Sequence, residues 1–153
     1  INNSFGIAFY KSQIAAGSPL PMQGRVFISV KNDDKRAIVF VAKKLSDMGF
    51  EIIATKGTHK VLSSNGIKAK LIGKIGEGNK KILEYLKAGQ INLIINTPSG
   101  EREQVDMKRI RSTAVMSGVS CITTLAGAQA AVNGIEAMLK GDLEIKPIQE
   151  YFR

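Results

Sequence analysis

The sequence is poor in the residues that build disulfides, metal centres and catalytic triads. It contains one cysteine, Cys121, and one histidine, His59, in 153 residues. A lone cysteine excludes a disulfide within the chain and a zinc site made of several cysteines, and it favours a reducing, cytoplasmic location. We interpret His59 as a surface or capping residue, because no cysteine or second histidine lies near it in sequence. Cys121 falls in a short apolar segment, which favours a buried, inert thiol.

Long apolar runs are also missing. No segment approaches the roughly 18 to 20 uninterrupted apolar residues of a transmembrane helix, and the N-terminus does not resemble a signal or transit peptide. We therefore expect no membrane partner. The chain starts with Ile1 rather than Met, so we expect a fragment cut from a longer protein. Its composition, 44% hydrophobic and 23% charged, is that of an ordinary folded domain.

Acidic residues are scarce relative to basic ones. Twenty-two Lys and Arg against 13 Asp and Glu give a net charge of +9, which favours an anionic partner. Aromatic residues make up only 6%, tryptophan is absent, and no RNP-like or helix-turn-helix signature is found, so the sequence argues against nucleic acid. A small phosphorylated anion fits better, although a solvated basic surface accounts for most of the lysines.

The apolar pattern predicts five strands that alternate with helices. Strands are expected at 25–30, 50–54, 68–72, 91–95 and 119–122, the fourth being the most apolar and therefore central. Helices are expected from Asp33 or Asp34 up to Gly49, and at about 57–64, 79–87, 105–117 and 124–139. This alternation predicts an α/β, Rossmann-like three-layer sandwich with a five-stranded, mainly parallel sheet. Residues 1–23 form a separate segment, with a short helix from Ser4 to Ala16 and a Gly/Pro-rich linker; the body spans 24–153.

Ligands of such sheets bind where the strands end, so the loops there carry the candidate site. They offer hydroxyls, an amide, glycines and isolated lysines, the groups that bind a phosphate and a ribose. Each loop also has a structural interpretation: Thr55 and Thr58 as helix caps, 96–100 as a turn, Lys35 and Lys74 as solvated charges. Walker A and GxGxxG motifs are absent. Asp106 is explained as a helix-start residue, and no carboxylates pair for acid–base work, so we expect binding without chemistry.

Several of these segments carry a family resemblance. They are Gly24-Arg25-Val26-Phe27-Ile28-Ser29-Val30 with Asp34-Lys35, Ala54-Thr55-Lys56-Gly57-Thr58, Lys74 with Glu77-Gly78, Ile94-Ile95-Asn96-Thr97-Pro98-Ser99-Gly100, Ile110-Arg111 with Ala114, and Thr123-Thr124-Leu125. The body resembles the methylglyoxal-synthase-like domain family. Within that family it is most similar to the C-terminal allosteric domain of the large subunit of carbamoyl-phosphate synthetase. The segments 5–11 and 17–21 look like the part that joins this domain to the preceding synthetase domain.

The resemblance implies a regulatory role in pyrimidine and arginine biosynthesis. It implies UMP as inhibitor, IMP at an overlapping site, and ornithine as activator at the boundary with the synthetase domain. By matching position, the effector phosphate falls on Lys35, Thr55, Gly57, Thr58 and Lys74, the ribose or base on Asn96, Thr97, Pro98 and Ser99, and the ornithine response on Thr123 and Thr124. The domain itself would hold no cofactor. The whole ligase would use ATP, Mg or Mn, and K, and it would associate with a glutaminase small subunit. Whether the chain forms a homo-oligomer is left open.

Two relatives in the same superfamily offer alternatives. Methylglyoxal synthase eliminates phosphate from dihydroxyacetone phosphate, which requires a carboxylate base with a histidine beside it. Here Asn79 stands at the aspartate position and Glu103 near the histidine position, while Asp106 resembles only a second active-site aspartate. The cyclohydrolase part of a purine-biosynthesis enzyme matches the loop at 55–58 but not the N-terminal segment. The regulatory domain is therefore the favoured hypothesis.

Overall fold

The computed structural model describes residues 2–15, 20–72, 78–98 and 101–141. The strands are β1 (Arg25–Val30), β2 (Glu51–Ala54), β3 (Lys70–Leu71), β4 (Leu93–Thr97) and β5 (Ser120–Ile122). The helices are α1 (Asn2–Ala15), α2 (Lys35–Asp47), α3 (Lys56–Ser64), α4 (Gly78–Lys87), α5 (Glu101–Met116) and α6 (Leu125–Leu139), with a 3-10 turn η1 (Asn32–Asp34) before α2. Within these ranges, no helix has the length and apolarity needed to cross a bilayer.

The five strands form one sheet in the order β3-β2-β1-β4-β5, and every pair is parallel. The expected α/β sandwich with a parallel sheet is thus confirmed. The expectation that the fourth strand is central is wrong, because β1 occupies the middle and β4 lies beside it. The register aligns Val30 with Thr97 and Ile28 with Ala54. The ends of β1 and β4 therefore meet at the carboxyl edge.

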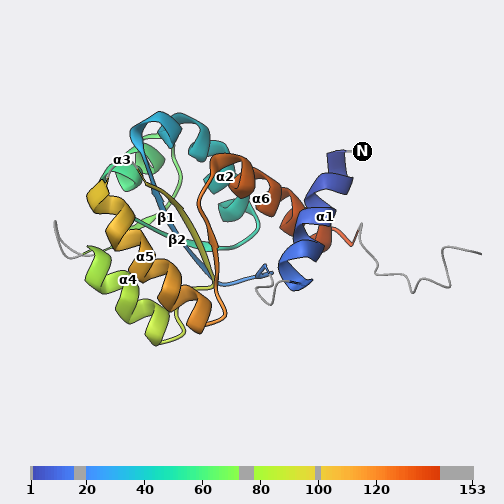
Figure 1. Ribbon diagram of the computed structural model, residues 1–153. Helices are drawn as coiled ribbons and strands as arrows, with labels where there is room; N and C mark the ends of the chain where they lie inside the picture. Colours follow the sequence, from blue (N-terminus) through green and yellow to red (C-terminus); the bar gives the residue numbers. More distant parts are fainter. Residues whose placement is uncertain (1, 16–19, 73–77, 99–100, 142–153) are drawn as a thin grey trace, which may run out of the picture.

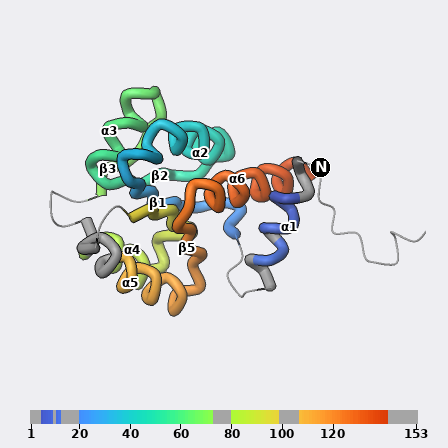
Figure 2. The backbone as a smooth tube through the Cα atoms, turned by 45° about the horizontal axis from the view of Figure 1, so that its top comes forward, coloured from blue at the N-terminus to red at the C-terminus, as the bar shows by residue number. Residues whose placement is uncertain are grey.

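Alternation along β1 divides the core between the two faces of the sheet. Val26, Ile28 and Val30 pack in a cluster with α2, α3 and α6. Phe27, which lies between them in sequence, packs in a second cluster with α4 and α5. The helices accordingly lie in two layers with the sheet between them (Figures 1 and 2). Burial of such side chains stabilises the fold by about 1.5–3 kcal/mol each.

Local chemistry sets where helices begin and end. In α2 the buried positions Ile38, Val41 and Leu45 recur at helical spacing. The helix is followed by Gly49, whose φ of +93° is one that glycine adopts without strain. At the start of α6, the Thr124 hydroxyl accepts a hydrogen bond from the Gly127 N–H at 3.0 Å. A residue with a short polar side chain thus caps the helix as expected.

The main differences from the sequence-based expectations lie in four elements. Helix α1 begins at Asn2 rather than at Ser4, and β3 has two residues because, as an edge strand, it pairs only with β2. Strand β4 begins and ends two residues later than expected, because Asn92 hydrogen-bonds Arg25 through both its backbone and its side chain before the ladder begins. Helix α5 begins four residues early, since 101–104 are good helix formers without apolar periodicity.

These shifts change two interpretations of the sequence. Asn96 and Thr97 belong to the end of β4 rather than to the loop after it. Asp106 lies inside α5 and does not head a helix, so the helix-start explanation given for it is wrong.

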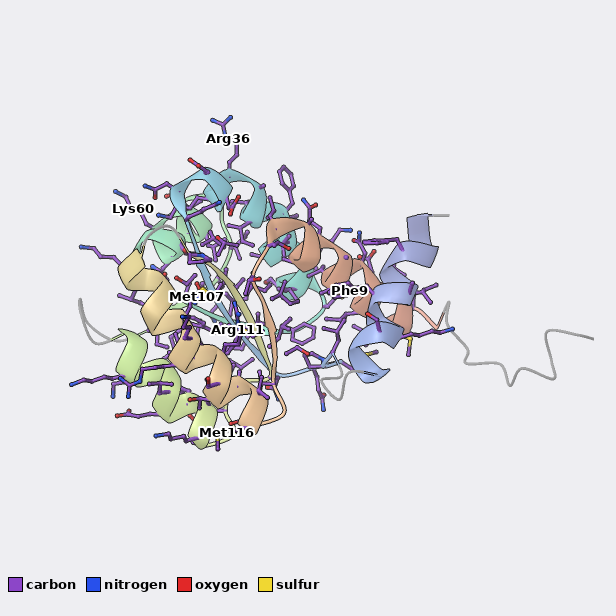
Figure 3. The ribbon with its side chains drawn as sticks, viewed as in Figure 1. Phe9, Arg36, Lys60, Met107, Arg111 and Met116 are labelled. Atoms are coloured by element: carbon purple, nitrogen blue, oxygen red, sulfur yellow. The ribbon has the colours of Figure 1, made fainter. Side chains whose placement is uncertain are left out.

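Helix α1 packs against α6 rather than standing apart from the body (Figure 1). A side chain at Gly6 would lie 3.0 Å from the backbone nitrogen of Gly134, so glycine favours this close approach of the two helices. Phe9 lies partly buried beside the core (Figure 3), and Leu20 is part of that core. The N-terminal segment is therefore in contact with the body on the α6 side.

Candidate anion-binding site

A cavity of about 410 Å³ opens at the carboxyl edge of the sheet, within the size range of small-molecule sites. It lies where β1 and β4 end and where α2, α3 and α5 approach. Its lining consists of Ser29, Val30, Lys31, Asn32, Lys35, Thr55, Lys56, Gly57, Thr58, Asn96, Thr97, Met107 and Ile110. Three of the four buried polar residues that the structure describes are among them: Thr58, Asn96 and Thr97. The fold thus concentrates its buried polar groups at this edge.

Two of these threonines tie β1 to its neighbours. The Thr58 hydroxyl accepts the Val30 N–H at 3.1 Å, and the Thr97 hydroxyl accepts the Lys31 N–H at 2.9 Å. Thr58 comes from α3 and Thr97 from β4, and they are 1% and 4% exposed. Two consecutive amides of the central strand's end are therefore satisfied by side chains from two different elements.

The same two hydroxyls remain able to donate. A hydroxyl carries one proton and two lone pairs, so accepting one N–H leaves the proton available. Among the described residues, no acceptor takes the proton of Thr58 or Thr97. Both side chains line the cavity and present donors to it. A ligand rich in acceptors, such as a phosphate or a carboxylate, can take the protons of both hydroxyls.

The start of α3 adds further donors. Thr55 occupies the N-cap position with extended dihedral angles, but its side chain makes no capping hydrogen bond. Its hydroxyl instead bonds the Ser29 hydroxyl at 3.0 Å. Thr55 therefore takes the N-cap position without a side-chain cap, and the Thr58 hydroxyl bonds Val30 instead of capping α3. The first N–H groups of α3 are left without a side-chain cap, which makes this helix end favourable for an anion.

The lysines that line the cavity have no acidic partner among the described residues. Lys31, Lys35 and Lys56 line it, and within the described residues none of them makes an ion pair. The Lys35 ammonium bonds only the neutral Asn32 side-chain oxygen, at 2.5 Å. Arg36 and Lys60 extend outward from α2 and α3 nearby (Figure 3) and add to the positive field. An anion entering here meets cations that no described carboxylate pairs with.

The opposite wall of the cavity is apolar. Met107 and Ile110 project from one face of α5 and are 3% and 2% exposed; Figure 3 shows Met107 on the inner side of that helix. The site therefore has a polar, positive side and an apolar side. None of the described lining residues is a carboxylate or a histidine, so this lining supplies no general base.

The structure brings together six of the residues expected at the effector site: Lys35, Thr55, Gly57, Thr58, Asn96 and Thr97. Pro98 follows β4 but does not line the cavity. Thr123 follows β5, and Thr124 caps α6; neither lines this cavity. Lys74 and Ser99 lie outside the described residues. Their roles, like the ligand contacts of all these residues, stay predictions.

Seven lining residues were not among the expected site residues: Ser29, Val30, Lys31, Asn32, Lys56, Met107 and Ile110. Ser29 had a signal, because it is the one polar residue between the apolar positions of a buried strand. Met107 and Ile110 also had one, since they stand three residues apart as apolar residues with Lys108 and Arg109 between them. Asn32 had none, because its role depends on a contact with Lys35 that only the folded chain makes.

His59 and Cys121 do not line the cavity, and each interacts with a neighbouring residue instead. The His59 Nε2 lies 3.0 Å from the Ala69 carbonyl and therefore donates to it, which fixes the segment leading into β3. Burial raises the pKa of the Cys121 thiol, and the Arg111 guanidinium opposes that rise. The raised pKa favours the neutral thiol, although Cys121 is half-buried rather than fully buried as expected.

The geometry defines a class of protein: a parallel α/β domain with a cavity at its carboxyl edge that is lined by hydroxyls and lysines. The chain belongs to the MGS-like domain family, whose model matches residues 37–123, more than half of the sequence.

Relatives with higher identity are parts of longer proteins. The chain is 50% identical over 152 residues to the carbamoyl phosphate synthase large chain of Archaeoglobus fulgidus, covering 99% of this chain and 14% of that protein. It is 49% identical over 151 residues to the carbamoyl phosphate synthase large chain, C-terminal section, of Methanocaldococcus jannaschii, covering 98% and 24%. The chain therefore spans only 14% to 24% of the length of these relatives.

Solved structures support the fold. A methylglyoxal synthase from Elizabethkingia anophelis NUHP1 superposes with a TM-score of 0.61 at 18% identity, covering 74% of this chain and 79% of that one. At this identity the likeness concerns the arrangement of strands and helices, not the chemistry.

Proposed function

We propose that this chain is the regulatory domain of a carbamoyl phosphate synthase large chain and binds a nucleoside monophosphate, UMP or IMP, in the cavity. One observation carries the proposal: the described lining offers hydroxyl donors and unpaired lysines but no general base. Such a lining binds an anion without transforming it. The 44% to 50% identity to carbamoyl phosphate synthase large chains supports the choice of enzyme.

The two sides of the cavity suit the two parts of a nucleotide. Lys35, Thr55, Gly57 and Thr58 would bind the phosphate at the start of α3, with Lys74 as a further phosphate ligand. Asn96 and Thr97 would bind the ribose or base, with Pro98 and Ser99 beside them. The apolar wall of Met107 and Ile110 would face the flat base.

The remaining features of the proposal concern the longer protein. There the ATP-dependent steps, with Mg or Mn and K, would be carried out by other domains, and a glutaminase small subunit would be a partner. Ornithine would act at the boundary with the synthetase domain, close to Thr123 and Thr124. The pathways would be pyrimidine and arginine biosynthesis, in the cytoplasm.

Regulation requires that the nucleotide bind one state of the whole enzyme better than another. The Thr58 and Thr97 bonds give such a difference a structural basis, because a ligand that draws α3 or β4 inward pulls on the same strand end. Differential affinity of about tenfold would correspond to about 1.4 kcal/mol of coupling.

Calorimetric titration of the chain with UMP, IMP, inorganic phosphate and dihydroxyacetone phosphate tests the proposal, with methylglyoxal release assayed in the last sample. Saturable binding of a nucleotide without turnover is expected. Methylglyoxal production would overturn the proposal in favour of a methylglyoxal synthase-type lyase. A complete lack of binding would overturn nucleotide binding by this chain on its own.

A further inference from the structure

The Lys35 ammonium is held at a defined place beside the first turn of α3. Its Nζ lies 2.5 Å from the Asn32 Oδ1. A methyl group added at Gly57 would lie 2.7 Å from the same Nζ and 3.2 Å from the Lys35 Cε. The ammonium therefore rests over Gly57, in the space that any other residue would fill.

This position is electrostatically unfavourable for a lysine. Helix N-termini carry partial positive charge, which disfavours a cation there. No carboxylate oxygen of the described residues lies within 4 Å of Nζ to offset this. Asn32 fixes the ammonium with a neutral oxygen, so the charge is positioned but not neutralised.

The backbone conformation at position 57 does not require glycine. It is the second residue of α3, and it is not among the described glycines with positive φ. Alanine is favoured over glycine inside a helix by up to about 1 kcal/mol. The space occupied by Lys35 is the feature that a side chain at this position would disturb.

We propose that Asn32 and the bare backbone of Gly57 are positioning elements that hold the charged Lys35 ammonium in place for the incoming anion. The proposal rests on the proposed function, because it concerns the same cavity. It adds Asn32 to the residues that control binding, and it assigns Gly57 a role in placing a lysine.

Gly57→Ala gives the sharpest test, because stability and binding should change in opposite directions. The new methyl group would meet the Nζ and Cε atoms of Lys35, which are the far end of a flexible side chain. Lys35 can therefore move aside while the backbone of α3 keeps its position. We expect an equal or higher Tm from the better helix former, together with UMP and inorganic phosphate binding weakened about 3- to 20-fold. Weaker binding with a lower Tm would indicate a general packing role and overturn the proposal for Gly57.

The double variant Lys35→Ala/Gly57→Ala tests whether Gly57 acts through Lys35. Once the lysine is removed, Gly57→Ala should weaken binding no further than Lys35→Ala alone. Independent, additive losses would show that the glycine backbone serves the anion directly, and they would overturn the positioning role.

Asn32 is tested by two replacements and a matched control. Asn32→Ala frees the ammonium, whereas Asn32→Asp keeps an acceptor but neutralises the charge. Both should weaken phosphate binding, but only Asn32→Ala should abolish the slowly exchanging ¹⁵N signal of the Lys35 ammonium. The control is Asn133→Ala, which breaks the Lys44–Asn133 bond of 3.0 Å away from the cavity and should leave binding unchanged.

The outcomes separate the two proposals. If the unaltered chain binds neither nucleotide nor phosphate, the proposed function fails; the Lys35 ammonium signal still reports whether Asn32 holds it. If the unaltered chain binds and the Asn32 and Gly57 variants bind equally well, the positioning role fails and the proposed function stands.

Discussion

Basic side chains at the two edges of the sheet differ in whether they have an acidic partner. At the amino edge, the Arg25 guanidinium bonds the Glu51 carboxylate at 3.0 Å and lies 5.7 Å from the centre of the Tyr85 ring. At the carboxyl edge, Lys31 and Lys35 have no carboxylate partner among the described residues.

The difference separates cations that serve the fold from cations that serve a ligand. Arg25 adds contacts with Glu51 and Tyr85, although its buried Nε has no hydrogen-bond partner among the described residues. An unpaired lysine over a helix N-terminus adds nothing to stability and is offset only when an anion arrives. The comparison therefore predicts which substitutions change stability and which change binding.

Replacing Thr58 should have the largest effect, because this residue serves both purposes. Thr58→Val removes the acceptor of the buried Val30 N–H, which should lower the free energy of unfolding by about 1–3 kcal/mol. It also removes a donor from the cavity, so nucleotide binding should fall at least about tenfold. Urea denaturation and calorimetry measure the two effects. Thr124→Val is the control: it should lower stability through the lost cap and leave binding unchanged.

Lys35→Ala should separate binding from stability, since we expect it to weaken binding and leave stability unchanged. Loss of one charge-assisted bond should weaken nucleotide and phosphate binding about tenfold. The Tm should not fall, because no ion pair among the described residues is lost. Lys43→Ala, an exposed change on the same helix, should affect neither quantity. A clear loss of stability in Lys35→Ala would break the comparison.

Arg25→Ala, at the amino edge, should have the opposite pattern of effects: it should lower stability and leave nucleotide binding unchanged. It removes the Glu51 ion pair and the Tyr85 contact, so the free energy of unfolding should fall by about 1 kcal/mol. Thermal denaturation measures this, with Glu51→Gln as the milder control. Weaker nucleotide binding in Arg25→Ala would mean that the two edges are not independent.

The ionisation of Cys121 should have the smallest effect on stability, and this effect should be measurable only at alkaline pH. Burial raises the pKa of its thiol in the folded state, so the thiol remains neutral after the unfolded thiol has ionised. Its contribution to stability is therefore complete below the ordinary thiol pKa and declines as the pH rises above it. Alkylation by iodoacetamide should be slower than for free cysteine, and Cys121→Ser should abolish it. Rapid alkylation of the folded chain at neutral pH would contradict this.

The sequence was sufficient to predict most of the architecture but only part of the site. Regular apolar spacing marks β1 and α2 because each buries one set of positions. The start of α5 was missed because propensity rather than burial extends it. The lysine–asparagine contact was missed because both residues look like solvated loop residues until the fold places them over α3. Thr55 and Thr58 were placed correctly, but their hydrogen-bond partners are set by tertiary contacts.

The hydrogen bonds at the end of β1 have a consequence for the entropy of binding. Strand ends usually fray, and ordering a residue costs about 1–2 kcal/mol of conformational entropy. Here the protein's own side chains, Thr58 and Thr97, accept the Val30 and Lys31 amides. The strand end is therefore ordered before a ligand arrives, and more of the contact energy remains as affinity.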